Sequence, residues 1–278
     1  MHDNRCSDSK RRGCQCSCGG TLHGNKRAPL ASGGDQSGAR LDPLEAAAWE
    51  KLLAAASVIQ GLVPGTILVG GTAAAIHAEH RVSLDADHVL SDLRARYEAT
   101  LATLEREAGW RTARRRAPII ILGSFEGIEQ GIRQLIRTRP LETTEIVTAS
   151  GKRLRIPTLT EITRIKAFLV LRRNTVRDHL DLVALASRIG TREAAQVLRH
   201  LDDYYTPPDD ASGLLPVASQ LARQLAEPRP VDLDSVEIKR FRGIDPRWSS
   251  WNAVEEACQT LAVALLEGDM AQEGEGSP

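Results

Sequence analysis

The sequence predicts an α+β protein, in which a mixed-sheet domain comes first and a helical bundle follows. Two observations lead to this prediction. Up to about residue 157, short β-branched runs alternate with amphipathic helical patterns. Beyond residue 157 the apolar spacing is helical only. Strands with interleaved helices followed by helices alone favour an α+β domain with a helical appendage.

The first predicted helix begins at Asp42, which can cap it. Pro43 suits the first helical position, and Glu45 places an acid in the first turn. Further patterns predict strands at 66–69, 83–90, 119–122 and 128–136, helices at 72–80 and 92–108, and a hairpin of 145–148 with 154–156. Residues 42–157 are therefore interpreted as the mixed-sheet domain.

The second part of the chain is predicted to be helical. The patterns place helices at 160–173, 177–189 and 191–204, and Pro207 opens a linker. We interpret 158–212 as a helical domain and 213–278 as a C-terminal extension of helices and loops. Together, the two domains would form a cleft.

Composition limits the cellular setting but does not identify a partner. The 36 basic residues balance the 36 acidic ones, so net charge argues neither for nor against nucleic acid. The start of the chain lacks an apolar secretory segment. Residues 52–76 carry no charge, but Pro64 and several glycines divide them into short elements. We expect a cytoplasmic protein that does not insert into a membrane.

Residues 1–41 are polar and predict a disordered arm that contains most of the cysteines. Cys14, Cys16 and Cys18, with His23 nearby, can supply three thiolates and an imidazole to Zn²⁺. The alternative is a reactive or merely disordered segment, because this tight spacing is unlike that of common zinc fingers.

The pattern with the clearest chemistry is a pair of carboxylates in a predicted strand. Asp85 and Asp87 are two residues apart and would share one face of it. Carboxylates so placed can hold Mg²⁺ or Mn²⁺ together with the phosphates of a nucleoside triphosphate (NTP). Upstream, Gly70, Gly71 and Thr72 lie at a strand-to-helix turn, where backbone N–H groups and a hydroxyl can cradle phosphate. Ordinary surface charge and an ordinary turn are the alternatives.

These residues resemble a known family motif. Its members carry a Gly-Gly turn, a short helix and Arg-x-Ser-x-Asp-x-Asp, which match Gly70, Gly71, Arg81, Ser83, Asp85 and Asp87. The chain thus resembles the AbiEii/AbiGii-type nucleotidyltransferase toxins, over roughly residues 44–200. The resemblance implies a polymerase-β-like nucleotidyltransferase fold and Mg²⁺-dependent transfer of a nucleoside monophosphate (NMP) from an NTP to an acceptor such as tRNA. It also implies a cognate antitoxin protein. Arg81 can bind phosphate or pair with an acid of the same cluster, and Ser83 can bind a phosphate or hold the strand edge.

The helical part contributes further candidate site residues. Lys166 lies in an apolar helix, where it can reach the surface or pair with triphosphate oxygens. The family resemblance favours the phosphate. Asp178 and Asp181 share a helix face, and either acid can orient Lys166 or Arg81. Asp178 alternatively stabilises the first turn of its helix.

The sequence departs from the family pattern in two places. His88 follows Asp87 where an apolar residue is more usual, and no third metal carboxylate is obvious. Glu129 is the candidate for that third ligand, with an ordinary exposed strand glutamate as the alternative. Without a third acid, catalysis would be weak or absent. The alternative function is therefore a degenerate, non-catalytic module that binds nucleotide or RNA.

A dense basic cluster follows the predicted helix at 92–108. Arg111, Arg114, Arg115 and Arg116, with Arg133, Arg137 and Arg139 expected nearby, can hold an RNA backbone beside the nucleotide pocket. A solvated loop is the alternative, because most charge runs are solvated.

Overall fold

The computed structural model describes residues 42–137, 139–206 and 215–273. These residues all belong to one compact unit of the chain. The predicted zinc ligands Cys14, Cys16, Cys18 and His23, and the linker that begins at Pro207, lie outside the described residues. Among the helices that the structure describes, none is both long and apolar enough to cross a membrane.

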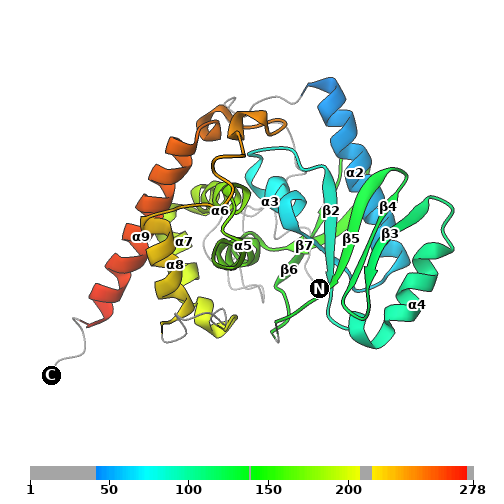
Figure 1. Ribbon diagram of the computed structural model, residues 1–278, viewed down its shortest axis with the longest axis horizontal. Helices are drawn as coiled ribbons and strands as arrows, with labels where there is room; N and C mark the ends of the chain where they lie inside the picture. Colours follow the sequence, from blue (N-terminus) through cyan, green and yellow to red (C-terminus); the bar gives the residue numbers. More distant parts are fainter. Residues whose placement is uncertain (1–41, 138, 207–214, 274–278) are drawn as a thin grey trace, which may run out of the picture. The chain divides into compact units, whose positions relative to one another are not determined.

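The N-terminal part is built on a mixed five-stranded sheet with strand order β1-β2-β5-β4-β3 (Figure 1). Strands β2 and β5 run parallel, and the remaining neighbours run antiparallel. The strands are β1 (Ile67–Val69), β2 (Asp85–Leu90), β3 (Trp110–Arg116), β4 (Ile120–Phe125) and β5 (Ile128–Gln134). A separate hairpin pairs β6 (Thr143–Val147) with β7 (Arg153–Pro157).

Helices α2 (Pro43–Leu62) and α4 (Leu93–Glu105) cover one face of this sheet (Figure 1). The buried side chains between them include Ile59, Tyr97 and Ile121. Burial of such apolar side chains is the main favourable contribution to folding. The opposite face of the sheet therefore remains available to a site.

The second part is the predicted helical bundle. Its helices are α5 (Leu159–Arg173), α6 (Val176–Ile189), α7 (Thr191–Arg199), α8 (Val217–Ala226) and α9 (Trp251–Glu273). Helix α3 (Gly70–Ala78) also packs into this apolar core through Ala73 and Ala74, so it connects the sheet to the bundle. The mixed sheet followed by a helical bundle confirms the predicted fold class.

The segment between α8 and α9 contacts the loop that leads into β2. The backbone N–H of Val82 donates to the carbonyl of Arg242 at 2.8 Å, and that of Asp245 donates to the carbonyl of His80 at 2.8 Å. The C-terminal segment, assigned to a separate extension from the sequence, therefore helps to position the strand that carries the carboxylates.

Most local predictions are confirmed. Asp42 caps α2 by accepting from the N–H of Glu45, and Thr158 caps α5 by accepting from the N–H of Glu161. The solvated-loop alternative for the arginine cluster is wrong, because Arg111–Arg116 lie in β3, an edge strand of the sheet. An arginine run lacks the alternation of apolar and polar residues that marks a strand.

The pairing of β3 with β4 leaves no room for a side chain at Gly123, which faces the apolar core. An added Cβ would lie 2.5 Å from Trp110 Cζ2 and 2.6 Å from the carbonyl oxygen of Arg111. Gly123→Ala should therefore lower the free energy of unfolding by about 1–3 kcal/mol, because the backbone must move to relieve the overlap. Urea denaturation measures this change.

Gly61 is the matched control, because a Cβ there meets nothing within 4 Å and the residue lies inside α2. Gly61→Ala should raise stability by roughly 0.5–1 kcal/mol through the better helix propensity of alanine. Equal effects of the two substitutions would contradict the packing of β3 on β4.

Candidate functional site

Strand β2 presents Asp85 and Asp87 toward a cavity of about 650 Å³. Burial alternates along the strand, so Ala86 and His88 are buried in the core while the two aspartates are partly exposed. A period of two residues is what a strand imposes on its side chains. The predicted carboxylate face is therefore present.

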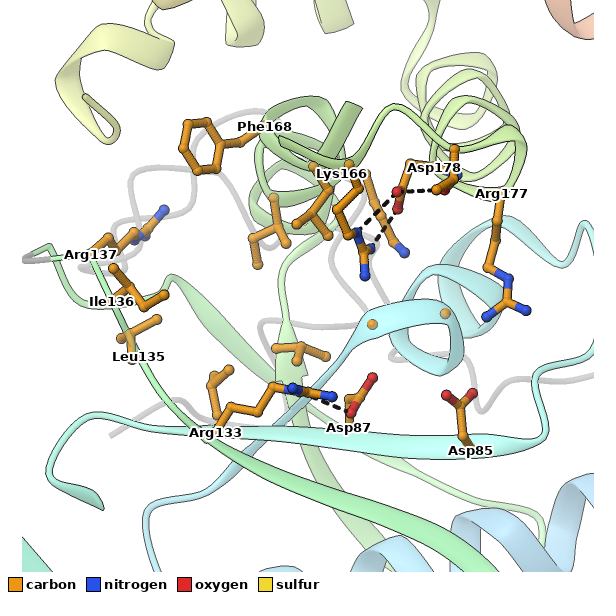
Figure 2. A pocket seen from close by; sticks show the side chains of 18 of the residues that line it. Asp85, Asp87, Arg133, Leu135, Ile136, Arg137, Lys166, Phe168, Arg177 and Asp178 are labelled. Atoms are coloured by element: carbon orange, nitrogen blue, oxygen red, sulfur yellow. Dashed lines mark hydrogen bonds and ion pairs between the residues drawn. The ribbon is translucent and has the colours of Figure 1, made fainter. Parts of the chain in front are cut away.

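The cavity has a polar end and an apolar end, both visible in Figure 2. Lys166 from α5 and Arg177 from α6 point toward the strand that carries Asp85 and Asp87. The apolar end is lined by Leu135, Ile136, Leu141, Ile165, Phe168 and Leu169, with Arg137 beside Ile136. A cavity of this volume, largely apolar with a few converging polar groups, is typical of a small-molecule site.

The N-terminus of α3 opens into the polar end through Gly70 and Gly71. No side chain caps this helix end within the described part of the chain. The first N–H groups of a helix have no partner inside the helix and carry a partial positive charge, which suits an anion. At Gly70, a Cβ would come within 3.3 Å of an Asp87 carboxylate oxygen, and φ is +72°. The positive φ favours glycine here, and a Cβ would also press on the side chain of Asp87.

Thr72 does not face the cavity. Its side chain is buried, and its hydroxyl donates to the backbone carbonyl of Asp85. The predicted phosphate contact of this hydroxyl is therefore wrong, because the hydroxyl holds β2 against α3. Ser83 has a similar local partner, since its Oγ donates to Asp85 Oδ1 at 2.9 Å.

Asp181 lies at the centre of a buried ionic cluster. Its carboxylate accepts from Arg81 Nε at 2.8 Å, from His80 Nε2 at 2.7 Å and from Lys166 Nζ at 2.7 Å. Arg81 and Lys166 hold the pKa of Asp181 well below its ordinary value, although burial alone would raise that pKa. The carboxylate is consequently ionised and fixes both cations.

This cluster decides between the alternative roles of its members. Lys166 is 1% exposed but lines the cavity, so it faces the site instead of reaching the outer surface. Asp181 is fully buried and is absent from the described lining, so it positions Lys166 and Arg81 and does not touch a ligand itself. Arg81 Nη2 abuts Gly71, where a Cβ would lie only 2.6 Å away.

Asp178 supports the first turn of α6, as the structural alternative predicted. Its carboxylate accepts from Thr175 Oγ1 at 2.7 Å and from Arg173 Nη2 at 2.6 Å. In return, Thr175 caps the helix by accepting from the N–H of Asp178. Asp178 lines the cavity wall, but its oxygens are engaged locally.

The two aspartates fit a magnesium ion that shares its ligands with phosphate. Mg²⁺ commonly binds one or two carboxylates and completes its shell with water and substrate phosphates. Among the described residues, no group of three or more His, Cys, Asp or Glu side chains is arranged to hold a metal ion. Glu129 pairs with Asp85 in the β2–β5 register and shares its face, but it is exposed and is not part of the cavity wall. Its role as a third ligand stays a prediction.

The contacts of several cavity residues were not predicted from the sequence, which placed Arg133 only in a basic rim beside the pocket. Arg133 on β5 reaches Asp87, with 3.4 Å between Arg133 Nε and Asp87 Oδ1. The segment between α8 and α9 supplies Asp232, Val236 and Phe241. These residues carry no local motif, and strand pairing and the chain path alone bring them to the site.

No protein-family model matches the chain. Over 131 residues it is 38% identical to the mycolic acid-containing lipids exporter MmpL11 of Mycolicibacterium smegmatis and 37% identical to the heme uptake protein MmpL11 of Mycobacterium tuberculosis. Each match covers 47% of this chain but spans only 13% of the relative. The transport functions in those names belong to the much longer proteins.

The solved structures similar to this chain include nucleotidyltransferases. JHP933 from Helicobacter pylori is 14% identical with a TM-score of 0.48, covering 86% of this chain and 100% of its own. A putative nucleotidyltransferase from H. pylori is 15% identical with a TM-score of 0.45, covering 85% and 100%. The antibiotic-resistance factor ANT(2'')-Ia is 14% identical with a TM-score of 0.39, covering 56% and 90%. Because each TM-score is below 0.5, we base the functional conclusion on the site geometry.

The buried carboxylate of Asp181 generates a stability prediction. Asp181→Asn leaves Arg81 and Lys166 buried without their counter-ion, so the free energy of unfolding should fall by roughly 3–5 kcal/mol. Urea denaturation at pH 7 measures the loss. Asp234→Asn changes an exposed aspartate in the same way and should alter stability by less than about 0.5 kcal/mol. Similar results for both variants would argue against a buried ionic cluster.

His88, on the core side of β2, generates a pH prediction. Burial lowers the pKa of His88 to about 4 from 6.5. Between these values the unfolded chain binds a proton that the folded chain does not, so stability falls as the pH drops from 6.5 to 4. His88→Leu should remove up to about 3 kcal/mol of this acid-induced loss, by the conversion of about 1.4 kcal/mol for each pKa unit.

The measurement is the free energy of unfolding at several pH values between 4 and 7. His200→Gln, which removes an exposed imidazole, is the matched control for loss of a histidine outside the core. A His88→Leu profile as steep as the wild-type profile would contradict the buried, neutral imidazole.

Proposed function

We propose that this protein is a nucleotidyltransferase that transfers an NMP from an NTP to an acceptor hydroxyl. The observation that carries the proposal is the placement of Asp85 and Asp87 on one cavity-facing side of β2, opposite Lys166. The uncapped N-terminus of α3 opens into the same space. Two carboxylates, an ammonium group and free backbone N–H groups form a site for a metal-bound triphosphate.

Each side chain has a distinct part in this scheme. Mg²⁺ held by Asp85 and Asp87 would supply charge neutralisation and orientation of the phosphates. Lys166, oriented by Asp181, offers a positive charge to a phosphate oxygen. Gly70 and Gly71 allow the phosphates to approach the backbone. The apolar end of the cavity accommodates the nucleobase and excludes water.

The reaction is an in-line displacement at phosphorus. The acceptor oxygen forms a bond to the α-phosphorus while the bond between that phosphorus and the bridging oxygen breaks. Pyrophosphate leaves with the electron pair, and the acceptor proton passes to solvent. Positioning and charge stabilisation supply most of the catalysis in this class of reaction.

The resemblance to AbiEii-type toxins adds finer proposals about the biological role. It suggests a polymerase-β-like fold family, a tRNA acceptor and a cognate antitoxin. These proposals rest on the motif from Gly70 to Asp87, and they extend the site chemistry to a toxin of the cytoplasm.

A second candidate function is nucleotide binding without transfer. It is favoured by one observation, because the described residues hold no group of three or more potential metal ligands near Asp85 and Asp87. A degenerate site with two carboxylates would still bind an NTP with Mg²⁺. Turnover therefore has to be measured separately from binding.

The decisive experiment combines labelled NTPs, Mg²⁺ and total RNA with wild type and Asp87→Asn. Loss of a metal carboxylate should reduce label transfer on the order of 10²-fold or more, since metal coordination contributes several kcal/mol of transition-state stabilisation. Thermal unfolding of both proteins verifies that the variant is folded. Equal labelling by both proteins would overturn the proposal.

Glu129→Gln in the same assay tests the third ligand. A loss comparable to that of Asp87→Asn would place Glu129 among the metal ligands, and unchanged transfer would make it an ordinary exposed strand residue. Wild-type binding of ATP with Mg²⁺, without transfer to any acceptor, would support the binding module instead.

A further inference from the structure

Strand β3 carries a run of arginines at the edge of the sheet. Arg111, Arg114, Arg115 and Arg116 are all exposed. In the part of the chain that the structure describes, none of them forms a salt bridge. Unpaired like charges so close together repel one another, so a polyanionic partner would stabilise them.

A β-bulge determines which of these side chains share a face. Arg111 pairs with Ser124 and Arg114 pairs with Leu122, with the register shifted between Thr112 and Arg114. One extra residue in a strand re-aims every side chain beyond it. The bulge therefore returns Arg114, and with it Arg116, to the face of Arg111.

Arg115 points to the opposite face. It pairs with Ile121, which is buried in the core beneath α2 and α4. Burial raises the pKa of Tyr97, a side chain of α4 in that core, and the charge of Arg115 partly offsets this rise. We call Arg111, Arg114 and Arg116 the open-face arginines, and Arg115 is their counterpart on the helix-covered face.

The strand register places the open-face arginines on the same face of the sheet as Asp87, three strands away. One lateral row across β3, β4, β5 and β2 consists of Arg114, Leu122, Gly131 and Asp87. Neighbouring strands lie about 4.8 Å apart, so the arginine backbone is roughly 14 Å from that of the carboxylate strand. This distance is short enough for a few nucleotides of a single strand to cross.

A second row lies beside the first and adds another cation. It consists of Arg116, Ile120, Arg133 and Val89. Arg133 is 44% exposed and reaches Asp87, while Ile120 is only partly buried and belongs to the cavity wall. The sheet surface between the edge strand and the aspartates thus offers a cation for phosphate and apolar side chains for bases.

We propose that the open-face arginines bind the backbone of a single-stranded nucleic acid whose 3′-hydroxyl enters the cavity at Asp85 and Asp87. This inference rests on the proposed nucleotidyl transfer, for which the 3′-oxygen is the acceptor that attacks the α-phosphorus and displaces pyrophosphate. Guanidinium groups form bidentate hydrogen bonds with phosphate oxygens, which suits binding to a nucleic-acid backbone.

Charged residues also protect exposed sheet edges against pairing with other chains. That role would involve all the arginines of β3 alike, including Arg115. Binding of a nucleic-acid backbone would involve only the arginines on the face shared with Asp87. The two explanations are therefore separable by comparing the faces of a single strand.

The test measures binding of a 5′-fluorescent 12-nucleotide single-stranded RNA by anisotropy over a range of salt concentrations. The proteins are wild type, the triple variant Arg111→Gln/Arg114→Gln/Arg116→Gln, and Arg115→Gln. Each phosphate contact to a single strand contributes about 0.7 to the slope of log K against log salt concentration. The triple variant should lose about 2 from this slope, while Arg115→Gln should retain the wild-type slope.

An unchanged slope in the triple variant, or an equal loss in Arg115→Gln, overturns the proposal. Size-exclusion chromatography of both variants excludes edge aggregation as the cause of any change. Tighter binding of a blunt duplex of the same sequence overturns the single-stranded assignment. Poly-glutamate tests for an acidic protein partner. If it binds as tightly as RNA and the triple variant loses both equally, the assignment of a nucleic-acid partner is overturned.

Separate measurements distinguish this inference from the proposed function. The triple variant should bind ATP with Mg²⁺ as wild type does, because the open-face arginines are not part of the described cavity wall. Failure of wild type to bind ATP would sink the nucleotidyltransferase proposal. RNA binding that is independent of the open-face arginines would contradict only the inference. Binding of a single-stranded DNA of the same sequence shows whether the strand is RNA or DNA.

Discussion

The position of the site depends on one buried carboxylate. Asp181 on α6 binds Lys166 on α5 and Arg81 in the loop before β2, so a single side chain joins the bundle to the carboxylate strand. Removing an ion from water costs several kcal/mol, and only close pairing offsets that cost. The cations therefore require Asp181 to remain buried, and Lys166 is fixed at the cavity by this pairing.

The electrostatic pattern around the cavity follows from this arrangement. Asp85 and Asp87 concentrate negative charge on β2, while cations from three other elements surround them, namely Arg133, Lys166 and Arg177. Acids within a ring of cations suit a ligand that is itself anionic and bound to a divalent metal ion. Glycines permit the close contacts, because a Cβ at Gly131 would lie 2.5 Å from an Asp87 carboxylate oxygen.

The sequence predicted the structure correctly where the pattern depends on neighbouring residues. The caps at Asp42 and Thr158, the alternation through Asp85 and the hairpin around Gly151 depend on residues a few positions apart, and all are present. Strand β3 was missed because edge-strand pairing, not its own side-chain pattern, holds an arginine run extended. The hydroxyl of Thr72 was misassigned because its acceptor, a backbone carbonyl, has no signature in sequence.

The sequence by itself determined the α+β class, the element order and the shared face of the two aspartates, because periodicity and capping act over a few residues. Only the tertiary structure decided that Asp181 orients Lys166 and Arg81, that Asp178 serves its own helix, and that Arg133 faces Asp87. Arg81 and Asp181 are 100 residues apart in the chain. Such contacts depend on how helices and strands pack, which no local spacing specifies.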